Sequence, residues 1–300
     1  MLNVLKCIYI ITYLFHYYLS KSLWSSKYLR GNNSWQMTDD LFFLAELAKK
    51  LNFPEGSLEF LNQIIKTNPS LEPNVQKFYI DLYFEFFRSY VNVLRKIQEK
   101  IDAQGMKLGQ IKLLQTIRTR YETSFVNLHN SFIDQVKNKL LSSVSDLNIQ
   151  FSYLKAIGDS YQYISGHIKG ETFTKKQNEA KESYEHALKI ANMEFQHSDP
   201  RYLRIVLNWA VFQYRFLKLK ESPTKQLFKC YQESLNLLEK VDLEKRMEFC
   251  SIMELIKTNM STWSTKPEEL KISDGSEEES EGDEKDKISK VKKKKKKKAK

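Results

Sequence analysis

The sequence predicts an all-α protein, a bundle or array of about nine antiparallel helices followed by a C-terminal tail outside the fold. Glycine (9 residues) and proline (6 residues) are scarce in a chain of 300 residues. No proline lies between Pro73 and Pro200, although sheet proteins need frequent turn residues. Apolar residues recur every three or four positions over long segments, which is the period of a helix. The hydrophobic fraction of 41% is sufficient for a core.

Composition divides the chain into three parts. Residues 1–36 contain an apolar and aromatic run, Cys7–Leu19, which is shorter than the roughly 20 residues of a membrane-spanning helix. A signal-peptide core is one interpretation, but we favour an upstream extension with Met37 as the true start. Residues 37–265 carry the helical pattern. Residues 266–300 are first acidic and serine-rich and then almost all lysine, which predicts a disordered tail.

Helix ends are predicted from capping residues, prolines and glycines. The first helix is expected to begin at Asp39 or Asp40 as its cap and to end before the segment 52–56. The second is expected over Ser57–Ile65. Seven more are expected at about Asn74–Asp102, Gln110–Leu141, Phe151–Ile168, Lys175–Phe195, Pro200–Leu217, Thr224–Glu239 and Leu243–Trp263. Prolines at positions 200 and 223 fall in first turns, where proline is tolerated.

Charge and cysteine content constrain the partners and the compartment only broadly. The net charge of +11 is compatible with nucleic acid, an anionic membrane, or acidic and phosphorylated proteins as partners. The three cysteines show no C-x-x-C spacing, which argues against a disulfide framework or a zinc site. We therefore expect a reduced intracellular protein, located in the cytoplasm with the nucleus as an alternative.

No catalytic, metal or cofactor site is predicted. The five histidines do not form an H-x-x-x-H pair, and neither G-x-S-x-G nor a phosphate-binding glycine loop occurs. Asp159 and Glu185 are interpreted as partners of helix ion pairs. Trp209 and Trp263, at helical positions, are interpreted as part of a core or of a groove wall.

Three segments together resemble the 14-3-3 protein family. Residues 153–163 read YLKAIGDSYQY and are similar to the family's YLKMKGDYYRY. Residues 203–214 read LRIVLNWAVFQY and resemble LGLALNFSVFYY, and residues 255–264 read LIKTNMSTWS and resemble LLRDNLTLWT. The segments keep the family's order and spacing, so the likeness covers about residues 38–265.

The resemblance implies a non-enzymatic adaptor. It implies a cup-shaped dimer, homo- or heteromeric, whose first helices form the interface. A concave groove in each subunit would bind extended phosphoserine or phosphothreonine peptides. The matching groove positions are Lys155, Asp159, Tyr163, Leu207, Asn208, Val211, Ile252, Leu255, Asn259 and Trp263. In the family the two asparagines bind the peptide backbone, and the leucine, valine and isoleucine form an apolar wall.

The family's phosphate clamp is not retained. Phe84 and Val91 stand at the clamp's lysine and arginine positions, Gln162 stands at its second arginine, and only Tyr163 is kept. A phosphate dianion needs charge-assisted donors, so we predict that phosphopeptide binding is weakened, relocated or absent.

A relocated cationic pocket is one alternative. Positions 84, 88, 91 and 95 share a helix face, and Arg88, Arg95 and Arg215 with Lys155 are its candidate residues. The alternative without a pocket is that Arg88 is simply solvated, while Phe84 and Val91 pack against neighbouring helices.

Two other functions remain open from the sequence. One is a helix-pair scaffold of the tetratricopeptide type, suggested by the segment 184–189 (YEHALK), although no period near 34 residues recurs. The other is a nucleic-acid-associated protein acting through the lysine run 292–298, which can also bind an anionic membrane. Its binding would fall steeply with salt and disappear on deletion of residues 287–300.

Overall fold

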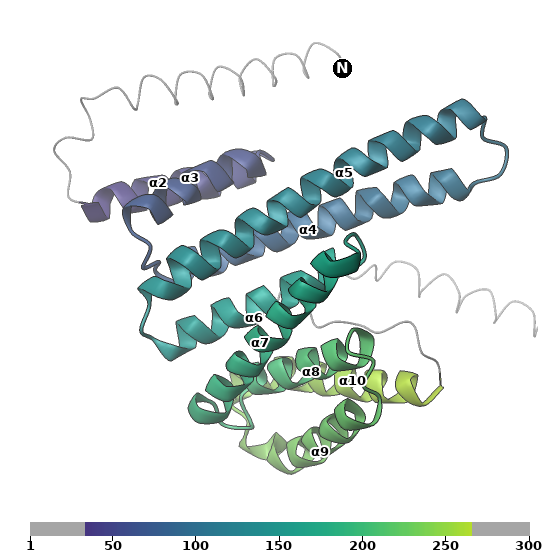
Figure 1. Ribbon diagram of the computed structural model, residues 1–300. Coiled ribbons are helices and arrows are strands. Elements are labelled where there is room, and N and C mark those ends of the chain that lie inside the picture. Colours follow the sequence, from purple (N-terminus) through teal and green to yellow (C-terminus); the bar gives the residue numbers. More distant parts are fainter. Residues whose placement is uncertain (1–33, 266–300) are drawn as a thin grey trace, which may run out of the picture.

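The computed structural model describes residues 34–265, drawn in colour in Figure 1. The N-terminal extension up to residue 33 and the tail 266–300 lie outside the described residues. The described part consists of α-helices without strands, which confirms the predicted all-α class. The helices are α2 (Ser34–Lys50), α3 (Pro54–Thr67), α4 (Pro73–Asp102), α5 (Leu108–Gln135), α6 (Leu147–Ile164), α7 (Gly170–Glu194), α8 (Pro200–Arg215), α9 (Glu221–Leu237) and α10 (Leu243–Thr265).

The first two helices begin earlier than predicted. Asp39 and Asp40, expected as caps, are exposed residues inside α2, which already includes Ser34. Because the helix already includes Ser34, neither aspartate is at its start, where a side chain could cap it. Pro54 is the first residue of α3, since that position needs no backbone N–H and suits proline. The break between the helices is therefore only residues 51–53.

The predicted helix 110–141 is not uniform, and the next one starts earlier than expected. After Gln135 the chain continues as a π-helix, Val136–Leu140, and a 3₁₀ turn, Leu141–Ser143. Helix α6 begins at Leu147, because the Asp146 carboxylate accepts a hydrogen bond from the Ile149 N–H at 3.0 Å.

Consecutive helices form antiparallel pairs, and the longest pair projects from the bundle. In the α4–α5 hairpin, Tyr90 stacks on Phe125 at 5.3 Å between ring centroids, and Arg118 hydrogen-bonds Gln98 nearer the turn. Figure 1 shows the closed end of this hairpin extending beyond the other helices. Helices α8, α9 and α10 form a compact group at the bottom of the picture, away from α2 and α3.

Helix α8 connects the two apolar clusters of the core. The larger cluster runs from α2 to α8 and includes Ile205, Trp209 and Phe212, while the smaller one joins α8 to α9 and α10 through Leu207 and Val211. From residue 205 to 214 every side chain of α8 is buried, as expected for a helix that is apolar on all sides. Trp209, interpreted from the sequence as part of a core or of a groove wall, is part of the core. No helix within residues 34–265 combines the length and apolarity needed to cross a lipid bilayer.

A buried histidine lies at the junction of α5 and α6. His129 is completely buried, and its Nε2 lies 3.2 Å from the Ser160 hydroxyl oxygen. The Ser160 hydroxyl donates to the Ile157 carbonyl at 2.7 Å, so it accepts from His129, which places the proton on Nε2. Burial lowers the pKa of His129 to about 3, and the positive charge of Lys176 contributes to this shift.

We expect His129 to make the fold sensitive to acid. Between its lowered pKa and its ordinary value near 6.5 the unfolded chain binds one more proton than the folded chain, so stability falls as the pH falls. The free energy of unfolding should drop by about 1.4 kcal/mol per pH unit from this residue. Urea unfolding of His129→Gln at several pH values should lack that slope. The exposed His186→Gln serves as control, and an unchanged slope in His129→Gln would contradict the assignment.

Candidate functional site

Four alternate helices run in the same direction and bring the predicted site residues together. The Gln76 side chain on α4 donates to the Ile149 carbonyl on α6 at 3.4 Å, and farther along both helices Phe84 packs on Tyr163 at 5.6 Å between centroids. These two contacts show that α4 and α6 are parallel. These contacts set how α4 and α6 lie relative to each other at the candidate site.

Helices α8 and α10 run in the same direction as α4 and α6. Asn208 on α8 contacts Asp159 on α6. The Arg204 guanidinium on α8 pairs with the Glu248 carboxylate on α10 at 2.7 Å. Farther along both helices, Tyr214 stacks on Trp263 with 4.2 Å between the ring centroids. Helices α4, α6, α8 and α10 therefore form a parallel set, called here the four-helix wall. All matching groove positions belong to its last three helices.

Asp159 is the centre of a buried polar network that joins three helices. One carboxylate oxygen accepts from the Tyr184 hydroxyl of α7 at 2.7 Å and from the Asn208 amide of α8 at 2.9 Å. The other accepts from the Lys155 ammonium one turn earlier on α6, at 2.6 Å. Asp159, Tyr184 and Asn208 are buried, and Lys155 is half-buried. The ion-pair role predicted for Asp159 is confirmed.

Tyr184 is a site residue that sequence analysis missed. Its side chain is completely buried, and its pKa is raised well above the ordinary value because burial and the nearby Asp159 charge disfavour the phenolate. Gln162, on the next turn of α6, donates a hydrogen bond to the Tyr184 hydroxyl. A tyrosine with helical spacing to apolar residues looks like any core residue in sequence. Only the contacts in the structure show that Tyr184 hydrogen-bonds both Asp159 and Gln162.

The close approach of Tyr184 to α6 depends on Gly158. A Cβ atom at position 158 would lie 2.8 Å from the Tyr184 ring, shorter than ordinary van der Waals contact. Glycine is therefore required here by packing, since a larger residue would push Tyr184 away from Asp159.

The positions that the resemblance aligns with the family's clamp carry packed, uncharged side chains. Phe84 is buried, and its ring contacts Phe87 at 5.6 Å and Tyr163 at 5.6 Å. Val91 is partly buried against the same core. The Gln162 amide is buried, and among the described residues its Oε1 has no hydrogen-bond donor. Each of these sites thus lacks a cation.

The candidate cations lie in different environments. Arg88 is half-buried on α4. It comes directly after Phe87 in the sequence, and the Phe87 ring centroid lies 6.1 Å from that of Tyr163. Arg215 is half-buried with its guanidinium 5.4 Å from the Phe216 ring centroid, and this burial lowers its pKa. Arg95 is exposed and pairs with Glu99 at 2.5 Å, about two turns beyond Arg88. Arg95 is thus farthest from the Tyr163 contact.

The apolar and amide positions are mainly interior. Leu207, Val211 and Ile252 are fully buried in the cluster that joins α8 to α10. Leu255 and Trp263 are partly exposed along α10. Asn208 and Asn259 are at most 1% exposed, and the Asn259 amide donates to the Leu255 carbonyl at 2.8 Å. The two amides lie on α8 and α10, which pack against each other, and each already donates within the protein.

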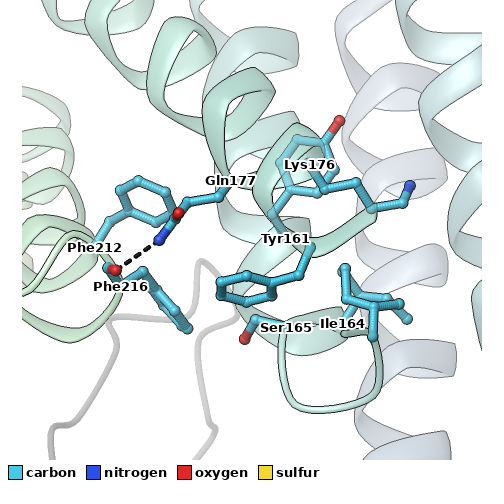
Figure 2. Close-up of a pocket in the computed structure, with 9 residues that line it drawn as sticks. Tyr161, Ile164, Ser165, Lys176, Gln177, Phe212 and Phe216 are labelled. Carbon is cyan, nitrogen blue, oxygen red and sulfur yellow. Dashed lines mark hydrogen bonds between the residues drawn. The ribbon is translucent and has the colours of Figure 1, made fainter. Parts of the chain in front are cut away.

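A small cavity lies behind the wall, at the ends of α6 and α8 (Figure 2). Its volume of about 10 Å³ holds roughly one water molecule. Figure 2 shows Gln177 of α7 reaching across to Phe216, where its amide donates to the backbone carbonyl at 2.6 Å. That bond satisfies a carbonyl at the C-terminal end of α8. The cavity is therefore a packing feature with no room for an organic ligand.

The described residues offer no accessible catalytic or metal-binding arrangement. His129 and Ser160 form a serine–histidine pair, but both are completely buried and the serine proton is donated to a backbone carbonyl. Between residues 34 and 265, no group of three or more histidine, cysteine, aspartate or glutamate side chains is placed to hold a metal ion.

Comparisons with known proteins give the same family along most of the chain. The model of the family described as 14-3-3 protein matches residues 44–264. The checkpoint signal transducer rad24 of Schizosaccharomyces pombe is 22% identical over 233 residues, which are 77% of this chain and 86% of rad24. Protein BMH2 of Saccharomyces cerevisiae is 22% identical over 77% of this chain and 85% of its own length. A 14-3-3-like protein of Oenothera elata is 22% identical over 74% and 87%.

We expect Gly158→Ala to destabilise the protein, because the added methyl overlaps the Tyr184 ring. The free energy of unfolding should fall by about 1–3 kcal/mol, as for other overpacked core positions. Chemical denaturation measures it. Gly166→Ala is a matched control, since a Cβ there meets nothing within 4 Å. Equal stability of the two variants would show that Tyr184 is not held against α6.

Removing the Asp159 carboxylate should cost more than removing an exposed one. In Asp159→Ala the half-buried Lys155 ammonium, the Tyr184 hydroxyl and the Asn208 amide lose a partner together, and breaking such a pair costs about 3–5 kcal/mol. Asp81→Ala, which removes an exposed i,i+4 partner of Lys77, should cost less than about 1 kcal/mol. Denaturant titration compares the two. A loss below 1 kcal/mol in Asp159→Ala would refute the central role of this carboxylate.

Proposed function

The chain belongs to the 14-3-3 family, and we propose that its four-helix wall binds partner segments with little or no dependence on a phosphate. As a 14-3-3 protein it is a non-enzymatic adaptor whose partners are proteins. Membership of this family replaces the tetratricopeptide interpretation of the segment 184–189. The phosphate independence and the contacts described below are the proposal.

The observation that carries the proposal is the packing of Phe84. Its ring is buried among Phe87, Phe132 and Tyr163, so the position cannot present a donor to a bound phosphate. Gln162 supports the same conclusion, because its amide is already engaged with Tyr184. Burying a cation at either position would carry a desolvation penalty of several kcal/mol. Neutral side chains at these two positions stabilise the four-helix wall and do not create a strong anion-binding site.

The remaining groove positions can still hold an extended chain. Leu255 and Trp263 offer partly exposed apolar surface on α10, where an aliphatic or aromatic side chain of a partner can pack. Lys155 offers polar hydrogens, whereas Asn208 and Asn259 are at most 1% exposed and lie beyond the reach of a guest chain. Because Lys155 already donates to Asp159, a guest chain exchanges one hydrogen bond for another. The net gain is then small, about 1 kcal/mol per bond, which favours reversible binding.

A relocated cationic pocket is the competing proposal, and Arg88 is its best candidate. Arg88 lies within one turn of the Phe84–Tyr163 contact, whereas Arg95 is exposed and paired with Glu99. Arg215 lies seven residues beyond Asn208, at the end of α8 that is level with the end of α6. Arg88 and Arg215 therefore lie on the two helices, α4 and α8, that contact α6 within the wall. An anion between them would still lack the paired guanidiniums of a bidentate clamp.

The proposal is tested with one extended peptide made with and without phosphate on its single central serine. Binding of each form is measured by fluorescence anisotropy to the wild type, to Arg88→Ala and to Lys189→Ala, an exposed cation on α7 that serves as control. We expect the phosphorylated and unphosphorylated peptides to bind the wild type with dissociation constants within about threefold of each other, less than 1 kcal/mol apart.

Two outcomes would change this conclusion. A preference of tenfold or more for the phosphopeptide that is lost in Arg88→Ala but kept in Lys189→Ala would establish the relocated pocket instead. The same preference kept in both variants would contradict the loss of the clamp without assigning it to Arg88. Equal binding of both peptides, weakened by Trp263→Ala, would support an apolar, phosphate-independent groove.

Three expectations from the sequence stay predictions. Family membership implies dimerisation in general, while the choice between a homodimer and a heterodimer stays a prediction. Nucleic acid or membrane binding through residues 287–300 concerns a segment outside the described residues. The cytoplasmic or nuclear location is likewise a prediction.

A further inference from the structure

Helix α9 lies at the edge of the fold and is buried on one face. Leu227 and Cys230 on its inner face pack into the apolar cluster that α8, α9 and α10 share. Figure 1 shows α9 at the bottom of the picture, below α8. Because α9 does not belong to the four-helix wall, its outer face is a surface that the proposed groove does not use.

Two large apolar side chains are exposed at this edge. Leu219, in the loop between α8 and α9, is 45% exposed, and Phe228, two turns into α9, is 56% exposed. The Leu219 N–H donates to the Gln213 carbonyl at 3.2 Å, which holds the loop against the end of α8. Single exposed apolar residues are common in proteins, so the surroundings of Leu219 and Phe228 decide whether they form a binding surface.

The surroundings of these two side chains are basic. Residues 218–229 contain four lysines and one acidic residue, a net charge of +3, and all four lysines are exposed. Lys225 pairs with Glu221 at 3.5 Å and Lys229 pairs with Glu233 at 3.8 Å, but exposed ion pairs of this kind are weak and are readily exchanged for another anion. We call the exposed apolar and basic side chains together the α9 patch: Lys218, Leu219, Lys220, Lys225, Phe228 and Lys229.

The backbone of the loop carries a lysine where glycine is favoured. Lys218 has a φ of 58°, in the left-handed region that glycine adopts more easily than any other residue. Its side chain is exposed, so packing in the core does not require a lysine there. The loop therefore places a cation directly before Leu219 at a conformational cost, as expected for a surface that binds an anion.

A depression lies beside Phe228, between the first turns of α9 and the last turns of α10. Its volume is about 420 Å³, and it is lined by Phe228, Met260, Thr224, Lys225 and Ser261. Apolar and polar groups therefore lie side by side, as they do where the acyl chains of a bilayer meet its headgroups. Ser261 comes four residues before the end of α10 at Thr265, so the chain leaves the described fold next to the α9 patch.

We propose that the α9 patch docks on an anionic membrane surface. Leu219 and Phe228 enter the boundary between headgroups and acyl chains, and the four lysines bind the anionic headgroups. Lysine is suited to this position because its apolar stem can lie along the boundary while its ammonium stays in water. One weak signal alone gives marginal membrane binding, whereas apolar insertion together with a basic patch gives stable attachment.

The lysine run 292–298 favours a membrane over other anionic partners. This run follows α10 in the chain, and clusters of four to eight basic residues are typical of segments that bind anionic lipid. A bilayer is an extended anionic surface that meets the α9 patch and the lysine run at the same time. A single acidic protein segment would have to span both. Nucleic acid would use the lysines but leave Leu219 and Phe228 without a role.

Docking through α9 leaves the four-helix wall accessible. The wall consists of α4, α6, α8 and α10, and its partly exposed apolar residues, Leu255 and Trp263, lie on α10. A subunit held by its α9 patch can therefore bind a partner segment at the membrane. The inference goes beyond the proposed function and does not rest on it.

The test measures flotation of the full-length chain with two kinds of vesicle, phosphatidylcholine alone and an equal mixture with phosphatidylserine. The lysine variant carries Lys218→Glu, Lys220→Glu, Lys225→Glu and Lys229→Glu, and the apolar variant carries Leu219→Ser and Phe228→Ser. Each has a matched control at exposed positions on other helices. The charge control carries Lys66→Glu, Lys137→Glu, Lys139→Glu and Lys189→Glu, and the apolar control carries Leu108→Ser and Met193→Ser.

We expect the wild type to bind the phosphatidylserine vesicles at least about tenfold more tightly than the neutral ones, because basic residues near an anionic surface each add attraction. Both patch variants should lose at least about tenfold of that affinity, and both controls should bind as the wild type does. Deletion of residues 287–300 should weaken binding but leave it dependent on the α9 patch. Circular dichroism confirms that each variant is folded.

Several results would overturn the inference. One is equal binding of the wild type to both kinds of vesicle, or binding to neither. Another is a lysine variant that binds as its control does. Loss of binding in the lysine variant but not in the apolar variant would assign the patch to polyanions in general, including nucleic acid. Binding abolished by deletion of residues 287–300 and kept in both patch variants would place the membrane contact in the tail alone.

Discussion

A single buried carboxylate holds together the helices on which the site depends. Asp159 accepts hydrogen bonds from Lys155, Tyr184 and Asn208, which fixes α6 relative to α7 and α8. A buried charge is tolerated only when it is paired and hydrogen-bonded, so the arrangement must be satisfied as a whole. Gly158 contributes by allowing the Tyr184 ring to approach α6. The register of the wall follows from this network.

The wall and the core share side chains, and this links binding to stability. Helix α8 has no free face: one side packs on α6 and α7, the other on α9 and α10. At the positions that the resemblance aligns with the family's clamp, Phe84 and Val91 add packing and Gln162 adds a neutral hydrogen bond.

The two halves of α4 differ in their packing. Phe84 and Phe87, in the first half, are buried in the core. From residue 95 to residue 124, which includes the end of α4 and the start of α5, no side chain is buried. The core therefore holds the first half of α4 directly and the second half only through its continuation as a helix.

The sequence by itself determined the all-α class, the described helices to within a few residues, and the family. Helical periodicity, the scarcity of glycine and proline, and the three segments that resemble the family are all properties that can be read along the chain. Helix starts were predicted less well, since a cap residue such as Asp146 is recognised only by its bond to Ile149. The tertiary structure alone decided which polar residues meet. Tyr184 looked like a core residue until its contact with Asp159 placed it in the network. Likewise, only packing showed that Phe84 is interior and that residues 95–124 have no core, because burial depends on neighbours that are distant in sequence.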